Sequence, residues 1–409
     1  MLRPAPGEHA ENRQVAYLSS PDVRSSIERV LEVQGLRPLH DAELVDLQHR
    51  PGAGATGVFR VRTAPGPGES TPPELYVALT AESVPEDAVI DAGRAADTDW
   101  SAWFHPHDPR LHGLALASDP ESVASVWGAG DPLTDLQTVS YRPLRRAVLR
   151  AVFGSRTVFL KVMRGGQATA LHHRHVLLAA AGVPVPPVLG PPVADVLALG
   201  QGAGTVLAGQ IMADGARRID PAEVTQLLDR MPAELLSLPQ REAWADRTPS
   251  YGHAAATALP DQARRIRSLV DHLQRQLDCS DRGPVVPAHG DLYEANLLVA
   301  EGRISCVLDI DGAGPGHRVD DLACFLGHLA VLPTVDERYV FTDSALRRFH
   351  SHFVTTVDPA ALACRSASVA LSLVAGARDS GRRDWQSAAR KRLDIAESLL
   401  GLPQSASGW

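Results

Sequence analysis

The sequence AHGDLYEANLLV at residues 288–299, followed by ISCVLDIDGAGPG at residues 304–316, decides the fold of this chain. Asp291 lies in a polar loop, and Asn296 follows five residues later at the start of an apolar strand. A second carboxylate, Asp309, ends the next strand. Carboxylate and amide oxygens are hard ligands, which Mg²⁺ prefers in sites that also take phosphate and water. The pattern therefore predicts a Mg²⁺ site beside a reactive carboxylate.

The spacing from Asp291 to Asn296 equals that of the kinase catalytic loop, in which an Asp is followed by four residues and an Asn. With DDLA at residues 320–323, the series HGDLYEANLLV, VLDID and DDLA resembles the aminoglycoside phosphotransferase and choline kinase family. The resemblance covers about residues 135–400. It implies an α+β, bilobal protein-kinase-like fold, with a small β-rich N-lobe and a larger helical C-lobe, that uses ATP and Mg²⁺.

The same resemblance gives each matching position a role in phosphoryl transfer. Asp291 is the expected catalytic residue, which accepts or orients the hydroxyl proton of the acceptor. Asn296 and Asp309 are the expected Mg²⁺ ligands, and Lys161 is expected to hold the α- and β-phosphates. A small molecule with a hydroxyl group is therefore the expected partner.

Supporting positions follow from the same motifs. His289 is expected to pin the loop by hydrogen bonds of its ring, with Asp321 or Asp320 as its partner. Asp311 either assists at the metal or caps its loop. Residues 210–215 are expected to form the hinge, so that backbone groups of Gln210 and Met212 meet adenine.

Upstream of the motifs, residues 136–212 read as five β-rich runs and one helix, a small sheet. Only two of the 40 basic residues in the chain are lysines, and one of them, Lys161, ends a strand of this sheet. Eight basic and no acidic residues lie between Asp135 and Asp195. This charge pattern fits either an anion site or a solvated face.

Two departures from the family pattern lie in the same region. The helix expected over residues 168–182 contains no acid that would pair with Lys161. The loop expected to cover the phosphates reads SYRPLRRAV at residues 140–148 and lacks glycine, so we expect Arg145 or Arg146 to bind phosphate instead. These departures leave open an alternative, a catalytically weak nucleotide-binding regulatory or scaffold protein.

Three regions are expected along the chain. Residues 1–130 form a small α+β cap, whose position resembles the architecture of actinobacterial maltokinases and glucosamine kinases. The N-lobe follows at residues 131–213. The C-lobe spans residues 214–409, with the catalytic loop at 288–299 and the metal-binding segment at 305–322. Residues 81–130 read as an irregular connection in which Trp100 and Trp103 belong to a core or an interface.

Composition limits the other classes of function. The net charge of −8 provides no overall polycation for nucleic acid or an anionic membrane. The N-terminus lacks the apolar segment of a secretory signal, so we expect a soluble cytoplasmic protein. The oligomeric state cannot be read from the sequence.

The identity of the acceptor stays open among aminoglycosides, sugars or aminosugars, and amino alcohols. Several acids of the helical region either line a pocket for a cationic acceptor or face solvent: Asp220, Glu223, Asp229, Glu234 and Glu242. The three histidines of the helix at 168–182 are expected on a solvated face: His172, His173 and His175.

Overall fold

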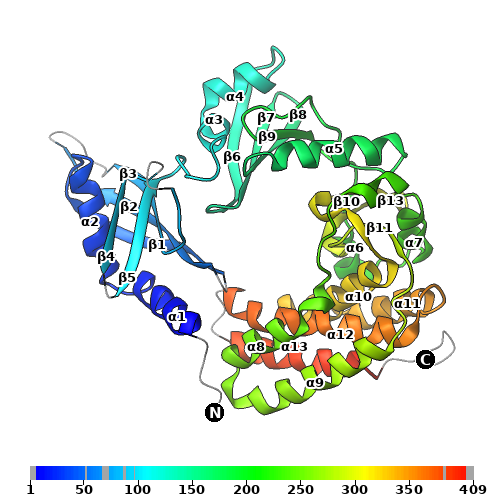
Figure 1. The fold of residues 1–409 in the computed structure, drawn as a ribbon. Coiled ribbons are helices and arrows are strands. Elements are labelled where there is room, and N and C mark those ends of the chain that lie inside the picture. Colours follow the sequence, from blue (N-terminus) through cyan, green and yellow to red (C-terminus); the bar gives the residue numbers. More distant parts are fainter. Residues whose placement is uncertain are drawn as a thin grey trace. The chain divides into compact units, whose positions relative to one another are not determined.

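The computed structural model describes residues 6–50, 53–66, 73–85, 89–95, 97–380 and 384–401. The chain forms two compact units. The first comprises Met1–His172 with Val188–Gln201, and the second comprises His173–Pro187 with Gly202–Trp409. The first is rich in strands and the second in helices, as the α+β expectation requires (Figure 1).

The first unit begins with two helices and an antiparallel five-stranded sheet of order β1-β2-β3-β5-β4. The elements are α1 (Pro6–Leu18), α2 (Val23–Val33), β1 (Leu39–Arg50), β2 (Gly54–Thr63), β3 (Glu74–Thr80), β4 (Asp91–Ala95) and β5 (Thr98–Phe104). Helix α2 packs Ile27, Val30 and Leu31 on the sheet, because these apolar residues recur at helical spacing on one face.

The expectation of an irregular connection over residues 81–130 was wrong. This stretch holds β4, β5 and two helices, α3 (Leu114–Ser118) and α4 (Pro120–Trp127). Trp100 is buried with Ala102 on one face of β5, and Trp103 is buried on the opposite face in a second cluster, which confirms the assignment of both tryptophans to a core. Clustered aromatic and turn residues obscured this period of two.

The second sheet of the first unit is an antiparallel meander of order β6-β7-β8-β9. Its strands are β6 (Leu133–Arg142), β7 (Arg146–Phe153), β8 (Arg156–Met163) and β9 (Val196–Gly200), and α5 (Gln167–Ala180) follows β8. In β7 the residues Ala147, Leu149, Ala151 and Phe153 are buried and their neighbours are more exposed. This alternation places one face of the strand on the core.

The fifth expected strand of this sheet, over residues 205–212, was also wrong. Only β10 (Thr205–Val206) is extended, and it belongs to the second unit, where it pairs with another strand of that unit. Residues Leu207–Asp214 form α6, which Gly215 ends in the left-handed conformation with a φ of 74°. A short apolar run does not by itself distinguish strand from helix.

The second unit contains two small sheets and a set of packed helices. The strands are β11 (Val285–Ala288), β12 (Leu297–Ala300), β13 (Arg303–Val307) and β14 (Gly314–His317). The helices are α7 (Ala222–Asp229), α8 (Thr248–Ala258), α9 (Ala263–Cys279), α10 (Arg318–Val335), α11 (Thr342–Phe353), α12 (Pro359–Ala375) and α13 (Trp385–Leu399).

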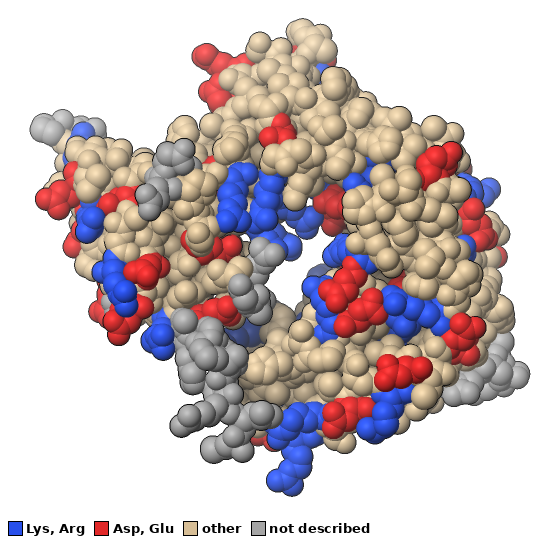
Figure 2. All heavy atoms as spheres, in the orientation of Figure 1, with Lys and Arg blue, Asp and Glu red and all other residues tan. Residues whose placement is uncertain are grey.

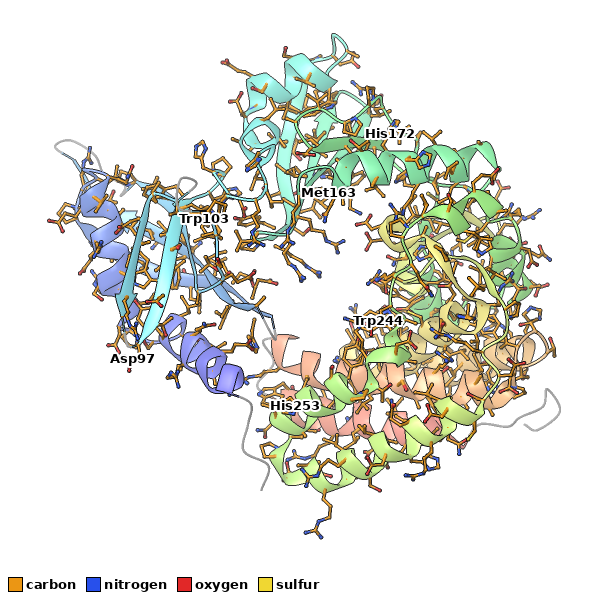
Figure 3. All side chains as sticks on the ribbon, in the orientation of Figure 1. Asp97, Trp103, Met163, His172, Trp244 and His253 are labelled. Atoms are coloured by element: carbon orange, nitrogen blue, oxygen red, sulfur yellow. The ribbon has the colours of Figure 1, made fainter. Side chains whose placement is uncertain are left out.

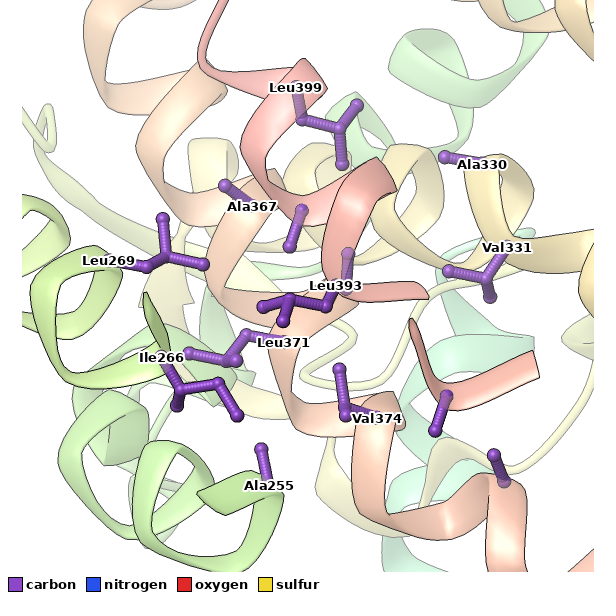
Figure 4. Packing of buried hydrophobic residues seen from close by; sticks show 14 of the residues in the cluster. Ala255, Ile266, Leu269, Ala330, Val331, Ala367, Leu371, Val374, Leu393 and Leu399 are labelled. Atoms are coloured by element: carbon purple, nitrogen blue, oxygen red, sulfur yellow. The ribbon is translucent and has the colours of Figure 1, made fainter. Parts of the chain in front are cut away.

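Helix α12 is the centre of the helical core (Figure 4). Leu371 and Val374 of α12 belong to one cluster with Ile266 of α9, Val331 of α10 and Leu393 of α13. The stretch Pro359–Arg378 is long and apolar enough to cross a membrane, but 72% of its apolar window is buried inside the unit. Its composition is thus accounted for by packing in a core.

Candidate active site

The catalytic loop connects β11 to β12 and begins with a tight approach of two backbone segments. Gly290 has a φ of 80°, and a Cβ atom at this position would lie 2.8 Å from the carbonyl oxygen of Gly312. A side chain is therefore excluded for two separate reasons, backbone conformation and space. The glycine of the HGD motif lets the loop pass against the segment that follows Asp309.

Asp321, near the start of α10, holds this loop through its backbone. One carboxylate oxygen accepts the N–H of His289 and the other accepts the N–H of Gly290, both at 2.8 Å. Asp321 is only 2% exposed, and burial raises the pKa of its carboxyl group. The expectation that the ring of His289 is the partner of Asp321 was wrong in this detail, because the bonds go to backbone N–H groups.

The ring of His289 instead joins the loop to the strand that leads to Asp309. Its Nδ1 accepts the backbone N–H of Asp291 at 3.2 Å, so Nε2 carries the proton and donates to the carbonyl oxygen of Leu308 at 3.0 Å. The ring is fully buried. The expected pinning role of His289 is thus seen in its two hydrogen bonds.

Asp320, the other candidate partner, belongs to a separate ion network. Its carboxylate accepts from Arg282 at 2.9 Å and from Arg365 at 2.6 Å. Arg282 also pairs with Asp246 at 2.9 Å. This network connects the start of α10 with α12 and with the segment before α8.

Asn296 and Asp309 lie at the two ends of the β12–β13 hairpin. The side-chain amide of Asn296 donates to the carbonyl oxygen of Asp291 at 2.9 Å, and the carbonyl oxygen of Asn296 accepts the N–H of Leu308 at 2.8 Å. Asp309 has a left-handed backbone with a φ of 53°, a conformation that non-glycine residues rarely adopt outside functional sites. The hairpin therefore holds the expected metal ligands next to the catalytic loop.

The donor set suits Mg²⁺ in its chemistry. Because the Nδ2 atom of Asn296 is bonded to Asp291, its Oδ1 atom is the one left for a cation, and Asp309 adds a carboxylate. Within the described ranges, no group of three or more His, Cys, Asp or Glu side chains could hold a metal. A site of one amide and one carboxylate needs further oxygens from phosphate and water, which is how Mg²⁺ is usually bound in kinases. Asp311 lies near Arg174, whose guanidinium donates to the carbonyl oxygen of Ala313.

The strand-rich unit carries the other expected nucleotide residues. Lys161 lies in β8 opposite Val148 and Leu197, and it is 8% exposed. Arg145 and Arg146 lie at the turn between β6 and β7, where Figure 2 shows basic side chains gathered. The hinge expected at residues 210–215 is not extended chain, because Gln210 and Met212 belong to α6 and their backbone groups lie in a helix. The strand after Lys161 ends at Gly200, so the short segment 201–204 is the connection that a hinge would need.

The turn between β6 and β7 is fixed by Asp108. Its Oδ2 atom accepts the N–H of Leu144 and the hydroxyl of Tyr141, both at 2.8 Å. Leu144 is buried with a φ of 62°, and Trp103 donates to the Tyr141 hydroxyl at 3.1 Å (Figure 3). Asp108 is itself 3% exposed. No local pattern marks this contact, because Asp108 lies 36 residues before Leu144.

Comparison with known proteins adds to these geometric observations. Residues 145–352 match the model of the phosphotransferase enzyme family. The chain belongs to this family. It is therefore an ATP-dependent phosphotransferase with an alcohol group as acceptor, and the recognised motifs lie within the matched range.

Solved structures confirm the fold of the phosphotransferase. The apo form of a thermostable mutant of the aminoglycoside phosphotransferase APH(4)-Ia has a TM-score of 0.51 at 17% identity, covering 69% of this chain and 100% of that one. A ternary complex of such a mutant with ADP and hygromycin B has a TM-score of 0.50 at 16% identity, covering 69% and 98%. The choline kinase LicA from Streptococcus pneumoniae has a TM-score of 0.47 at 14% identity, covering 69% and 96%. Among curated proteins, none matches this sequence.

Sequence reasoning missed two side chains that lie against the carboxylate of Asp291. The indole Nε1 of Trp244 donates to Oδ1 of Asp291 at 3.1 Å, and a guanidinium nitrogen of Arg241 lies 3.7 Å from Oδ2 (Figure 3). Both residues precede α8, almost 50 residues before Asp291. No local motif marks them, because the contact exists only after the chain has folded.

Trp244 also belongs to a group of four ring-bearing side chains and one arginine, which we call the Trp244 cluster: Trp244, Arg247, Tyr251, Tyr293 and His328. Tyr251 stacks on Trp244 with ring centres 5.8 Å apart, and Tyr293 stacks on His328 at 4.4 Å. Burial raises the pKa values of Tyr251 and Tyr293 to about 12 and lowers that of His328 to about 4. At neutral pH all three side chains are therefore uncharged.

Proposed function

We propose that this phosphotransferase moves the γ-phosphoryl group of ATP to a hydroxyl group of a small polar acceptor, with Asp291 as the catalytic residue. The oxygen of the acceptor forms the new bond to phosphorus, and the bond between the γ-phosphorus and the bridging oxygen of ADP breaks. Asp291 takes the proton from the acceptor hydroxyl as its oxygen attacks. No covalent enzyme intermediate is needed.

One observation carries this proposal, namely that the catalytic loop and the Asp309 segment are bonded together. His289 bonds to the N–H of Asp291 and to the carbonyl oxygen of Leu308, the residue before Asp309. Asn296 bonds to the carbonyl oxygen of Asp291 and to the N–H of Leu308. Phosphoryl transfer depends mainly on positioning and on electrostatic stabilisation, since the transition state needs little covalent help from the protein. A rigid connection between the proton acceptor and the metal ligands supplies that positioning.

Asn296 and Asp309 would hold Mg²⁺ in this proposal. When bound, Mg²⁺ neutralises charge on the β- and γ-phosphates and thereby stabilises the transferring group. Lys161, buried in β8, would hold the α- and β-phosphates, and Arg145 or Arg146 would bind phosphate in place of a glycine-rich loop. The segment 201–204 takes the place of the hinge expected at residues 210–215.

The indole N–H of Trp244 gives Asp291 a fixed orientation. A hydrogen bond to Oδ1 prevents rotation of the carboxylate, so Oδ2 is the atom that receives the proton. A guanidinium nitrogen of Arg241 lies 3.7 Å from Oδ2. We therefore assign Trp244 as a positioning residue.

The proposal is tested by ADP release in the presence of Mg²⁺ across hexoses, hexosamines, aminoglycosides and choline. Asp291→Asn should lower kcat by at least about a hundredfold, because a general base contributes roughly that much or more. ATP should still raise the Tm of this variant. Asp271→Asn, on the exposed side of α9, is the matched control and should behave like the unmodified chain. Full activity of Asp291→Asn would overturn the assignment.

A nucleotide-binding regulator is the second candidate function, and one observation favours it. Helix α5 contains no acidic residue, so the usual acidic partner of the phosphate-binding lysine is missing from that helix. A regulator would show an ATP-dependent rise in Tm without ADP release for any acceptor. Acceptor-dependent ADP release that Asp291→Asn abolishes would exclude this candidate.

A further inference from the structure

The Trp244 cluster lies directly beside the catalytic carboxylate and identifies the chemistry of the acceptor. Trp244 donates to Asp291, and the other members contact Trp244 or the catalytic loop through their rings. An acceptor hydroxyl within reach of Asp291 must therefore pass close to these side chains. Aromatic walls with a few polar atoms are typical of sites for small molecules.

Three polar atoms of this cluster are buried without a hydrogen-bond partner in the part of the chain that the structure describes. They are the hydroxyl oxygen of Tyr251, Nε2 of His328 and Nε of Arg247. Buried polar atoms in folded proteins nearly always have partners, so three such atoms on touching side chains require an explanation. Hydroxyl groups can both donate and accept hydrogen bonds, so they match each of these three atoms in chemistry.

The charges beside Asp291 disfavour a cationic acceptor. The guanidinium of Arg247 lies 5.4 Å from the ring centre of Trp244 and 5.0 Å from that of Tyr251. A quaternary or primary ammonium group would need these same aromatic surfaces, which already face a cation. Arg241 adds a second positive charge next to Asp291.

Most of the acids that were candidates for a cationic pocket are engaged or exposed elsewhere. Asp229 pairs with Arg318 at 2.7 Å, and Glu223 pairs with Arg303 at 3.4 Å. Glu242 lines a cavity beside the catalytic loop together with Arg241, Arg282, Asp320 and Asp321; of these acids, Asp320 is paired with Arg282 and Asp321 accepts backbone N–H groups. Asp220 and Glu234 are exposed, and Asp220 caps its own segment by accepting the N–H of Ala222.

From these contacts we infer that the acceptor is an uncharged polyhydroxyl compound of the carbohydrate class. Its ring packs on the Trp244 cluster, and its hydroxyl groups bond to Tyr251 and His328 while one of them delivers its proton to Asp291. The inference rests on the proposed function and narrows it, because polycationic aminoglycosides and choline are disfavoured. Tyr251 and Arg247 are thereby specificity residues.

The first test compares glucose with glucosamine, a pair that differs by one charged group, together with maltose, myo-inositol, kanamycin and choline. ADP release should respond to at least one of the uncharged compounds and more strongly than to any amine. Tyr251→Phe should raise the KM for that compound about tenfold and leave the KM for ATP within twofold. Tyr76→Phe, on the exposed side of β3, is the matched control without effect. Arg247→Glu should shift the ratio of kcat/KM at least tenfold from glucose toward glucosamine.

The outcomes separate this inference from the proposed function. A stronger response to glucosamine, kanamycin or choline would overturn the inference and leave the phosphotransferase assignment intact. If no compound releases ADP, the second measurement is tryptophan fluorescence during titration with the same sugars in the presence of a non-hydrolysable ATP analogue. The Trp244→Phe variant is the control that assigns the signal to Trp244. Sugar-dependent quenching that Trp244→Phe removes would support the inference, and its absence would overturn it. A failure of ATP to raise the Tm would instead overturn the proposed function.

Discussion

The catalytic loop and the turn between β6 and β7 are each held by one buried aspartate, but the two aspartates distribute their hydrogen bonds differently. Asp321 gives both of its oxygens to the catalytic loop, at the N–H groups of His289 and Gly290. Asp108 gives one oxygen to its own segment, at Arg110 and Leu111, and the other to the turn. The first loop is therefore fixed by the helix that follows it in the same unit, whereas the second depends on a segment that precedes its sheet. The turn between β6 and β7 contains no glycine, and its conformation is fixed by hydrogen bonds to a residue outside the turn, Asp108.

Asp321→Ala should have the largest effect, because it leaves two N–H groups of the catalytic loop without an acceptor. We expect a loss of about 3 kcal/mol in the free energy of unfolding. The kcat should fall about a hundredfold, since Asp291 follows these residues directly. Denaturant unfolding and ADP release measure the two effects, with the exposed Asp343→Ala as control. Unchanged kcat would mean that the loop keeps its shape without the clamp.

Asp108→Ala should have a smaller effect of a different kind. It removes the acceptor of the buried Leu144 N–H, so we expect a loss of about 2 kcal/mol in the stability of the first unit. The KM for ATP should rise several-fold while kcat changes little, because the affected turn carries Arg145 and Arg146. Asp99→Ala, at an exposed position of β5, is the control. A fall in kcat at unchanged KM would contradict the contrast between the two loops.

An acid titration should separate the surroundings of the catalytic loop from those of the turn. Burial lowers the pKa of His328, which stacks on Tyr293, to about 4. The unfolded chain binds this proton at a higher pH than the folded chain does, so the stability present above pH ~6.5 is lost as the pH falls toward 4. At pH 5 the loss should be about 2 kcal/mol.

His328→Phe should remove this slope, because phenylalanine keeps the stacking and does not titrate. Unfolding free energies of the variant and the unmodified chain between pH 4 and 8 provide the measurement. His272→Phe, on the exposed side of α9, should retain the slope. Parallel curves for His328→Phe and the unmodified chain would show that another group is responsible.

The smallest effect is expected for the turn itself. Replacing Arg145 and Arg146 together by glutamine should raise the KM for ATP about fivefold, since charge-assisted bonds to phosphate are lost while the turn keeps its backbone. The unfolding free energy should stay nearly constant. Arg275→Gln on α9 is the control for a simple loss of charge. An unchanged KM would remove these arginines from the phosphate site.

The sequence allowed prediction of features that depend on consecutive residues. The positions of Asp291, Asn296 and Asp309 follow from one short motif and one hairpin, so their arrangement was accessible before the structure. Trp244, Arg241 and Asp108 were not accessible, because each meets its partner only through tertiary packing.

Local ambiguity explains the remaining differences. The apolar run at residues 205–212 fits a strand as well as a helix, and only the pairing of β10 with β12 and the cap at Gly215 decide for α6. His175 was expected on a solvated face, but it is buried with Nδ1 3.1 Å from the carbonyl oxygen of Pro186. In both cases a distant contact overrides the local pattern.

The central position of α12 also determines how the protein inactivates on heating. When the helical core opens, this helix exposes its apolar stretch Pro359–Arg378 to water along its whole length. Unfolded chains that expose apolar segments of this kind are prone to aggregate before they refold. The half-life of the folded protein at a given temperature is then governed by the rate at which α12 separates from the helical core. Additives that slow this unfolding step will preserve activity even if they leave ligand affinity unchanged.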